Sequence, residues 1–156
     1  MAPKCLTRAE DARKFFACQH MHPLAYIALG SNLGDRDQLL ARARTALAAL
    51  PRSRVVAESS VEETAPVSDV PQGAYLNQMV ALETELSPRE LLAELQRIER
   101  EAGRVRTVHW GPRTLDLDIV RFGDQHVDEP DLVIPHPQLS HRDWWQRELA
   151  ELGATE

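Results

Sequence analysis

The chain contains little cysteine and no long apolar run. Its two cysteines, Cys5 and Cys18, lie near the N-terminus, and neither has the spacing to another Cys or His that is typical of a zinc site or a disulfide framework. No segment reaches the roughly 18 apolar residues of a membrane helix, and the N-terminus lacks the apolar core of a secretory signal. We therefore expect two reduced thiols without a structural role and a cytoplasmic protein with no membrane partner.

An excess of positive charge is also missing. The 24 acidic residues outnumber the 18 Lys and Arg residues, so the formal net charge is −6, which argues against binding of nucleic acid. A length of 156 residues, 43% of them hydrophobic, allows one well-formed core but not two. We expect a monomer with a single domain over residues 23–156.

The first 22 residues are polar and only weakly periodic. Thr7 could cap a short helix in this segment. Because no core pattern is present, we expect a disordered or loosely docked extension, with Met21 as an alternative start of the chain.

Hydrophobic spacing predicts strands and helices in a definite order. The expected strands cover 24–29, 55–64, 76–86 and 115–122, and the expected helices cover 35–50 and 88–102. Ser87 and Glu90 form a capping box for the second helix. This order predicts an α+β fold of the ferredoxin-like βαββαβ type, an antiparallel sheet with two helices on one face. A small C-terminal hairpin is expected after Phe122.

The segment 103–118 combines cations, an indole and two carboxylates. Asp116 and Asp118 are two apart on an expected strand, so they share a face, and paired carboxylates suit Mg²⁺. Leu115, Leu117 and Ile119 would fill the opposite face. The cations Arg104, Arg106 and Arg113 outnumber the two acids, which points to an anionic ligand such as a phosphate.

The alternative is a solvated surface, since a charged loop beside a strand is usually that. Two features of the sequence favour a binding site for an anionic ligand instead. Gly111-Pro112 fixes a turn directly before Arg113, and Trp110 precedes it, where an exposed indole is favoured only if it packs on something flat. The segment 30–34 is no P-loop, because the spacing and the lysine of that motif are missing.

These motifs closely resemble the signature of the 6-hydroxymethyl-7,8-dihydropterin pyrophosphokinase family of the folate pathway. The resemblance extends from about Leu24 to Leu152. It is carried by the strings 25–35, 64–66, 75–77, 104–106, 110–119 and 134–137, in the order of the family.

The resemblance implies the transfer of pyrophosphate from ATP to the hydroxymethyl group of a reduced pterin, with release of AMP. Two Mg²⁺ ions would be held by Asp116 and Asp118, while Arg104 and Arg113 stabilise the transferring group and Asp118 is a candidate base. The residues implied to bind the pterin are Thr64, Pro66, Val67, Tyr75, Asn77 and Trp144. Those implied to bind the nucleotide are Gln96, Glu99, Arg106, Trp110, Arg113, Ile119, His136 and Arg142.

Three departures from the family pattern leave rivals open. Many relatives carry Phe where Trp144 stands, and polar or basic residues where Asp131 and Val133 stand. The segment 144–152 is more polar than the apolar final strand expected, and the chain ends early. One rival is therefore a ligand-binding protein that has lost turnover. An RNA-binding module of the same fold is disfavoured, because it needs a basic sheet face with exposed aromatics.

Overall fold

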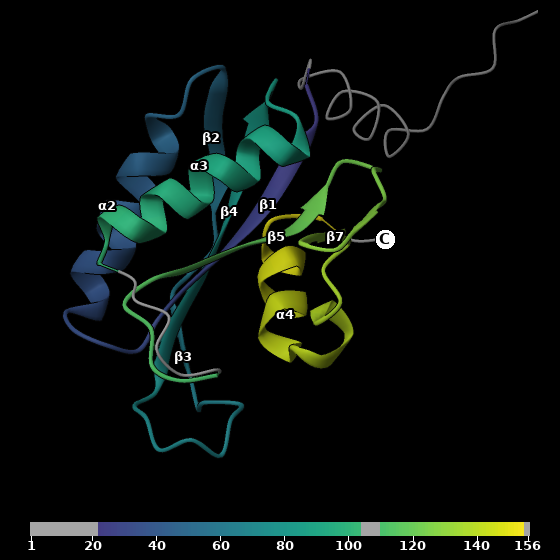
Figure 1. The fold of residues 1–156 in the computed structure, drawn as a ribbon. Helices are drawn as coiled ribbons and strands as arrows, with labels where there is room; N and C mark the ends of the chain where they lie inside the picture. The colour runs from purple at the N-terminus through teal and green to yellow at the C-terminus, as the bar shows by residue number, and fades with distance from the viewer. Residues whose placement is uncertain (1–21, 104–109, 155–156) are drawn as a thin grey trace, which may run out of the picture.

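The computed structural model describes residues 22–103 and 110–154, which form a sheet with helices on both faces. The strands are β1 (Leu24–Ser31), β2 (Ser53–Glu58), β3 (Glu62–Thr64), β4 (Tyr75–Thr84) and β5 (Asp116–Phe122). Their order is β2-β4-β1-β5, with β3 also paired to β4, and every pairing is antiparallel (Figure 1). The predicted ferredoxin-like α+β architecture is thereby confirmed.

One predicted strand was wrong in its extent. The segment 55–64 was expected to be continuous, but β2 ends at Glu58 and β3 begins at Glu62. Between them the Ser59 hydroxyl donates to the Ser60 carbonyl and accepts the Met79 backbone N–H. This local bonding replaces the regular ladder, so the edge of the sheet is broken in two.

Helices α2 (Arg36–Ala48) and α3 (Pro88–Glu101) lie together on one face of the sheet (Figure 1). Both begin where their capping residues predict. Asp35 accepts the Gln38 N–H at 3.1 Å, and the predicted capping box of Ser87 and Glu90 is present. The larger core is formed by apolar residues of these two helices against the inner side chains of β1, β4 and β5.

A third helix, α4 (Asp143–Glu151), follows the short turn η1 (Leu139–His141) and covers the other face (Figure 1). Trp145 and Leu149 pack in a second core cluster with residues of β1, β4 and β5, namely Ala28, Met79 and Val120. The polar segment in which the family pattern led us to expect a strand is therefore a helix. Trp145, Leu149 and Leu152 are spaced i, i+4, i+7, which is the period of a helix and not of a strand.

The predicted C-terminal hairpin is confirmed as β6 (Val127–Glu129) and β7 (Leu132–Ile134). Arg89 of α3 holds it in place by contacts with Glu129 and, at 2.7 Å, with Asp131. The helices in the described part of the chain are too short or too polar to span a membrane. The expected N-terminal helix around Thr7 lies outside the described residues.

Candidate active site

The pocket floor is formed where three neighbouring strands meet. Gly30 of β1 lies opposite Asn77 of β4 on one side and opposite Asp116 of β5 on the other. Ala28, two residues earlier in β1, lies opposite Asp118 of β5. Because Ala28 and Gly30 of the central strand have small side chains, polar groups from the flanking strands line the pocket. The lining residues are Ala28, Leu29, Gly30, Thr64, Ala65, Val67, Ser68, Gln72, Tyr75, Asn77, Trp110, Arg113, Asp116, Asp118, Arg142, Trp144 and Trp145.

The two carboxylates predicted as metal ligands point to the same side of the sheet. Leu117 and Ile119 are buried in the larger core, on the side of α2 and α3, so Asp116 and Asp118 face the α4 side. The alternation predicted from their spacing is confirmed. Arg113 Nη1 donates to Asp116 Oδ2 at 2.7 Å, so one predicted cation lies directly beside one predicted carboxylate.

This pair has the donor chemistry of a magnesium site that is completed by a ligand. Mg²⁺ usually takes one or two protein carboxylates and fills its octahedral shell with water and substrate phosphates. Within the described ranges, no group of three or more His, Cys, Asp or Glu side chains could hold a metal by itself. Asp116 and Asp118 therefore fit an ion that arrives with phosphates better than an all-protein site.

Asp118 is faced by a histidine and a further arginine. His136 Nε2 lies 3.6 Å from its Oδ1 and Arg142 Nη1 lies 3.9 Å from its Oδ2. Burial alone would raise the pKa of Asp118, but His136, Arg142 and Arg113 outweigh burial and lower it below its ordinary value. The carboxylate is thus kept ionised, as a metal ligand must be.

The orientation of His136 is fixed by two backbone hydrogen bonds. Its N–H donates to the Val120 carbonyl of β5 at 2.9 Å. Its Nδ1 accepts the Gln138 N–H at 3.1 Å, which leaves the proton of the neutral ring on Nε2, the nitrogen that faces Asp118.

Two tryptophans at the start of α4 surround the guanidinium of Arg142. Its Cζ lies 4.3 Å from the ring centre of Trp145 and 5.7 Å from that of Trp144. Trp145 was not among the predicted site residues. Its position directly after Trp144 is the only signal the sequence gives, and a buried aromatic residue is usually read as core.

The opposite wall of the pocket comes from β3, β4 and the loop between them. The Asn77 amide nitrogen donates to Thr64 Oγ1 at 2.7 Å and to the Glu62 carbonyl at 3.3 Å, which leaves Oδ1 as the acceptor for a ligand. A Cβ added at Gly30 would lie 3.5 Å from the Tyr75 ring, an ordinary van der Waals distance, so the ring lies directly over this part of β1. Of the predicted pterin residues, Pro66 is the one that does not line the pocket.

Asn32, in the turn after β1, joins the loops around the pocket. Its Nδ2 donates to Gln72 Oε1 at 2.8 Å and to the Gly73 carbonyl at 3.1 Å. Gln72 in turn donates to the Trp110 carbonyl at 3.0 Å. Trp110 has a φ of 60°, a strained conformation for a residue with a bulky side chain. The residue is 44% exposed and lines the pocket. The sequence excluded a P-loop at 30–34 but did not single out Asn32 or Gln72.

Several predicted nucleotide residues do not line this pocket. Glu99 is buried and accepts the Leu117 N–H at 2.8 Å, and Ile119 is in the larger core. Gln96 is partly buried on α3. Arg104 and Arg106 lie outside the described residues. The nucleotide roles of these residues remain predictions.

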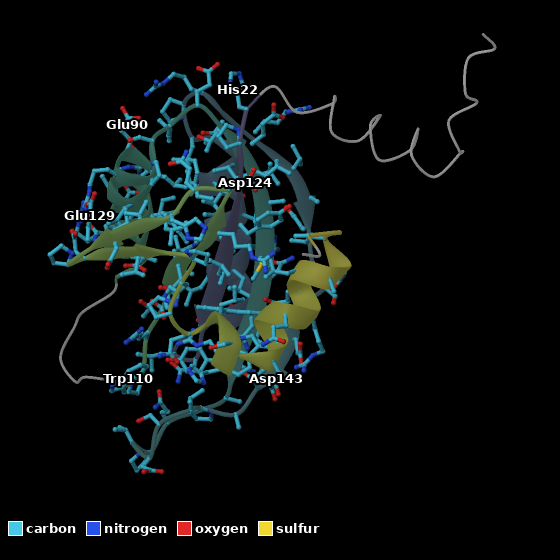
Figure 2. The ribbon with its side chains drawn as sticks, turned by 90° about the vertical axis from the view of Figure 1, so that its right-hand side faces the viewer. His22, Glu90, Trp110, Asp124, Glu129 and Asp143 are labelled. Atoms are coloured by element: carbon cyan, nitrogen blue, oxygen red, sulfur yellow. The ribbon has the colours of Figure 1, made fainter. Side chains whose placement is uncertain are left out.

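Figure 2 shows Trp110 and Asp143, the first residue of α4, at the end of the molecule away from His22. Aromatic walls, paired carboxylates and cations thus gather at one end of a ferredoxin-like sheet. Flat rings favour a planar ligand, and carboxylates with guanidinium groups favour a metal-bound polyphosphate. This combination defines a phosphate-transferring enzyme.

Comparison with known proteins specifies the family. The sequence profile of the 7,8-dihydro-6-hydroxymethylpterin-pyrophosphokinase family matches residues 26–154. The 2-amino-4-hydroxy-6-hydroxymethyldihydropteridine pyrophosphokinase of Bacillus subtilis (strain 168) is 44% identical over 132 residues, which are 85% of this chain and 79% of that protein. The proteins of the same name from Pseudomonas aeruginosa and Haemophilus influenzae are 44% and 45% identical, covering 82% and 83% of this chain and 79% and 81% of theirs. The chain belongs to this pyrophosphokinase family.

Proposed function

We propose that the chain transfers pyrophosphate from ATP to 6-hydroxymethyl-7,8-dihydropterin, releases AMP, and does so in the pocket between β3, β4, β5 and α4. Family membership carries the reaction and its ATP co-substrate. The observation that supports this location is the convergence of Asn77, Asp116 and Asp118 on one side of the sheet, between aromatic walls.

The pterin lies between the rings of Tyr75 and Trp144 in this proposal. Aromatic rings on two sides fix a flat heterocycle in one plane. The Asn77 amide, held by Thr64 and Glu62, then presents Oδ1 to N–H groups on the pterin edge. Trp144 replaces the Phe of many relatives without loss of an aromatic wall, since it lines the same pocket.

The ATP phosphates lie beside Asp116 and Asp118. The two carboxylates would hold two Mg²⁺ ions, which would supply positive charge against the negative charge that develops on the phosphates during transfer. Arg113 and Arg142 line the same pocket and donate to phosphate oxygens in this proposal. His136 is not among the lining residues, but its Nε2 lies 3.6 Å from Asp118 Oδ1, close enough to the pocket to donate as well. These groups position the reactants and stabilise charge, which is the main part of catalysis in phosphoryl transfer.

The bond changes require no nucleophile from the protein. The hydroxymethyl oxygen of the pterin forms a bond to the β-phosphorus of ATP, the bond from that phosphorus to the oxygen bridging to the α-phosphate breaks, and AMP leaves with that oxygen. The hydroxyl proton passes to solvent or to a phosphate. Because its neighbours lower the pKa of Asp118, that residue is better suited to holding a metal than to accepting the proton.

Release of AMP tests this proposal and separates it from the rival that binds without turnover. The protein is incubated with ATP, Mg²⁺ and the hydroxymethyl pterin, and AMP is followed by chromatography with pterin omitted as a control. AMP that depends on pterin supports the enzyme. Pterin binding with no AMP would establish the rival instead.

Asp128→Asn, on the exposed β6, serves as a matched control variant outside the site. Size-exclusion chromatography tests whether the protein is a monomer, as we expect.

A further inference from the structure

Trp145 makes ring contacts with both donor side chains that lie beside Asp118, Arg142 and His136. The guanidinium carbon of Arg142 lies 4.3 Å from its ring centre. The His136 ring meets the indole edge-on, with centroids 4.9 Å apart and planes at 88°. One indole therefore contacts both side chains beside Asp118. Arg142 Nη1 lies 3.9 Å from Asp118 Oδ2, and His136 Nε2 lies 3.6 Å from Asp118 Oδ1.

The indole is itself held firmly. Trp145 is only 2% exposed and packs with Ala28, Met79 and Val120 of the sheet. Ala28 lies opposite Asp118 in the strand register. The ring is thus anchored on the strands that carry the candidate metal carboxylate, so contacts with the ring fix a position relative to that carboxylate.

Arg142 depends on this ring more than His136 does. Two backbone hydrogen bonds hold His136. Within residues 22–103 and 110–154, by contrast, the Arg142 guanidinium makes no hydrogen bond, and its partners are Asp118 and the two indole rings. A desolvated indole face attracts a guanidinium and limits where the flexible side chain can go.

We propose that Trp145 is a positioning residue that holds Arg142, with His136 beside it, against Asp118 so that both side chains can donate to the nucleotide phosphates. This inference rests on the proposed function. The two adjacent tryptophans would then have different roles. Trp144 would contact the pterin, whereas Trp145 would affect nucleotide binding through Arg142.

Substitutions that separate packing from ring chemistry test the proposal. Trp145→Leu keeps an apolar side chain without a ring, Trp145→Phe keeps a smaller ring, and Leu149→Ala opens the same core cluster. The measurements are Tm, the Kd of a non-hydrolysable ATP analogue with Mg²⁺, and the Kd of pterin. Trp145→Leu should weaken nucleotide binding about tenfold and change pterin binding less than about twofold, with Trp145→Phe intermediate. Leu149→Ala should lower Tm alone. Equal nucleotide losses in Trp145→Leu and Leu149→Ala would overturn the proposal.

A double-mutant cycle tests whether Trp145 acts through Arg142. In an Arg142→Met background, Trp145→Leu should weaken nucleotide binding by no more than about threefold, because the group it positions is gone. The same tenfold loss in both backgrounds would show that the indole acts by another route and would overturn the assignment.

Fluorinated tryptophan keeps the test independent of folding. Site-specific replacement of Trp145 by mono- and trifluorinated analogues retains the shape of the indole but reduces the negative charge on its face. Nucleotide affinity should fall stepwise with fluorination while Tm stays constant, and an unchanged affinity would overturn the proposal. Wild-type protein that binds no ATP analogue and releases no AMP would overturn the proposed function with it. If the wild-type protein binds the ATP analogue and releases AMP, but the Trp145 variants keep its nucleotide affinity, only this inference is overturned.

Discussion

The side chain of Asn32 holds Arg113 by its backbone, from 81 positions away in the sequence. Its Oδ1 accepts the Arg113 N–H at 2.8 Å, and the backbone N–H of Asn32 donates to the Arg113 carbonyl at 3.2 Å. The same side chain donates to Gln72 and Gly73. The loop on the pterin side and the loop that carries the phosphate-facing arginine are thus joined by one amide.

Asn32→Ala should therefore affect both substrates. Asn32 is 7% exposed, so its removal leaves buried polar groups without partners, at a cost of about 1–3 kcal/mol. We expect a Tm lower by several degrees, a higher KM for pterin and a lower kcat, measured by thermal unfolding and steady-state kinetics. Leu33→Ala, at an exposed neighbour in the same turn, should change none of these. If Tm fell while KM and kcat stayed the same, the hydrogen bonds of Asn32 would have no part in catalysis.

Asp116→Asn and Asp118→Asn should each nearly abolish turnover. Either change removes a negatively charged oxygen ligand that Mg²⁺ needs, while both side chains border the pocket and contribute little to the core. Near-native circular dichroism and a Tm close to that of the parent should accompany the loss. Normal activity of either variant at ordinary Mg²⁺ concentrations would refute the metal assignment.

Arg113→Ala and Tyr75→Ala should have opposite kinetic signatures. Arg113 lies beside Asp116 and should stabilise the transferring phosphates, so its loss should lower kcat by about ten- to a hundredfold, from a charge-assisted contact of roughly 1.5–3 kcal/mol. Tyr75→Ala should instead raise the Kd of pterin first. Calorimetric titration of pterin with an ATP analogue present, combined with single-turnover kinetics, separates the two effects. If Arg113→Ala lost pterin affinity and kept its rate, the two roles would have to be exchanged.

Glu148 of α4 should make the stability of the protein depend on pH. It is 2% exposed, and neither carboxylate oxygen has a hydrogen-bond partner among the described residues. Burial, together with the negative charges of Glu62 and Glu151, raises its pKa to about 8, against a smaller opposing effect of Arg147. The native protein therefore keeps a proton that the unfolded chain releases near its ordinary pKa of 4.5.

The free energy of unfolding should consequently fall as pH rises from about 4.5 to about 8, because the native state binds more protons in that window. Glu148→Gln removes the ionisable group, so its Tm should exceed that of the parent at pH 8.5 and match it near pH 5, as thermal unfolding across pH would show. Asp128→Asn should follow the parent throughout. Parallel curves for the parent and Glu148→Gln would mean that Glu148 does not titrate in this window.

The sequence by itself determined the order of the elements from β1 to β5, apart from the break between β2 and β3, and the chemistry of the carboxylate pair. Local rules were sufficient for α3, because Ser87 and Glu90 cap the helix with their own side chains. They were also sufficient for the orientation of Asp116 and Asp118, because side chains alternate along any strand. Family resemblance added Tyr75, Asn77 and Trp144, which line the pocket.

Only the tertiary structure decided what surrounds that pair. Asn32 joins two loops through hydrogen bonds between residues far apart in the chain, and sequence spacing carries no information about such contacts. The secondary structure of the segment 144–152 was likewise undecided by the sequence, since its polar residues conflict with the apolar final strand of the family pattern. The segment forms α4 because Trp145, Leu149 and Leu152, at i, i+4 and i+7, share one face of a helix and pack together on the second face of the sheet, whereas a strand would place Leu152 on the side opposite the other two. That packing brings the indole of Trp145 to Arg142 and His136.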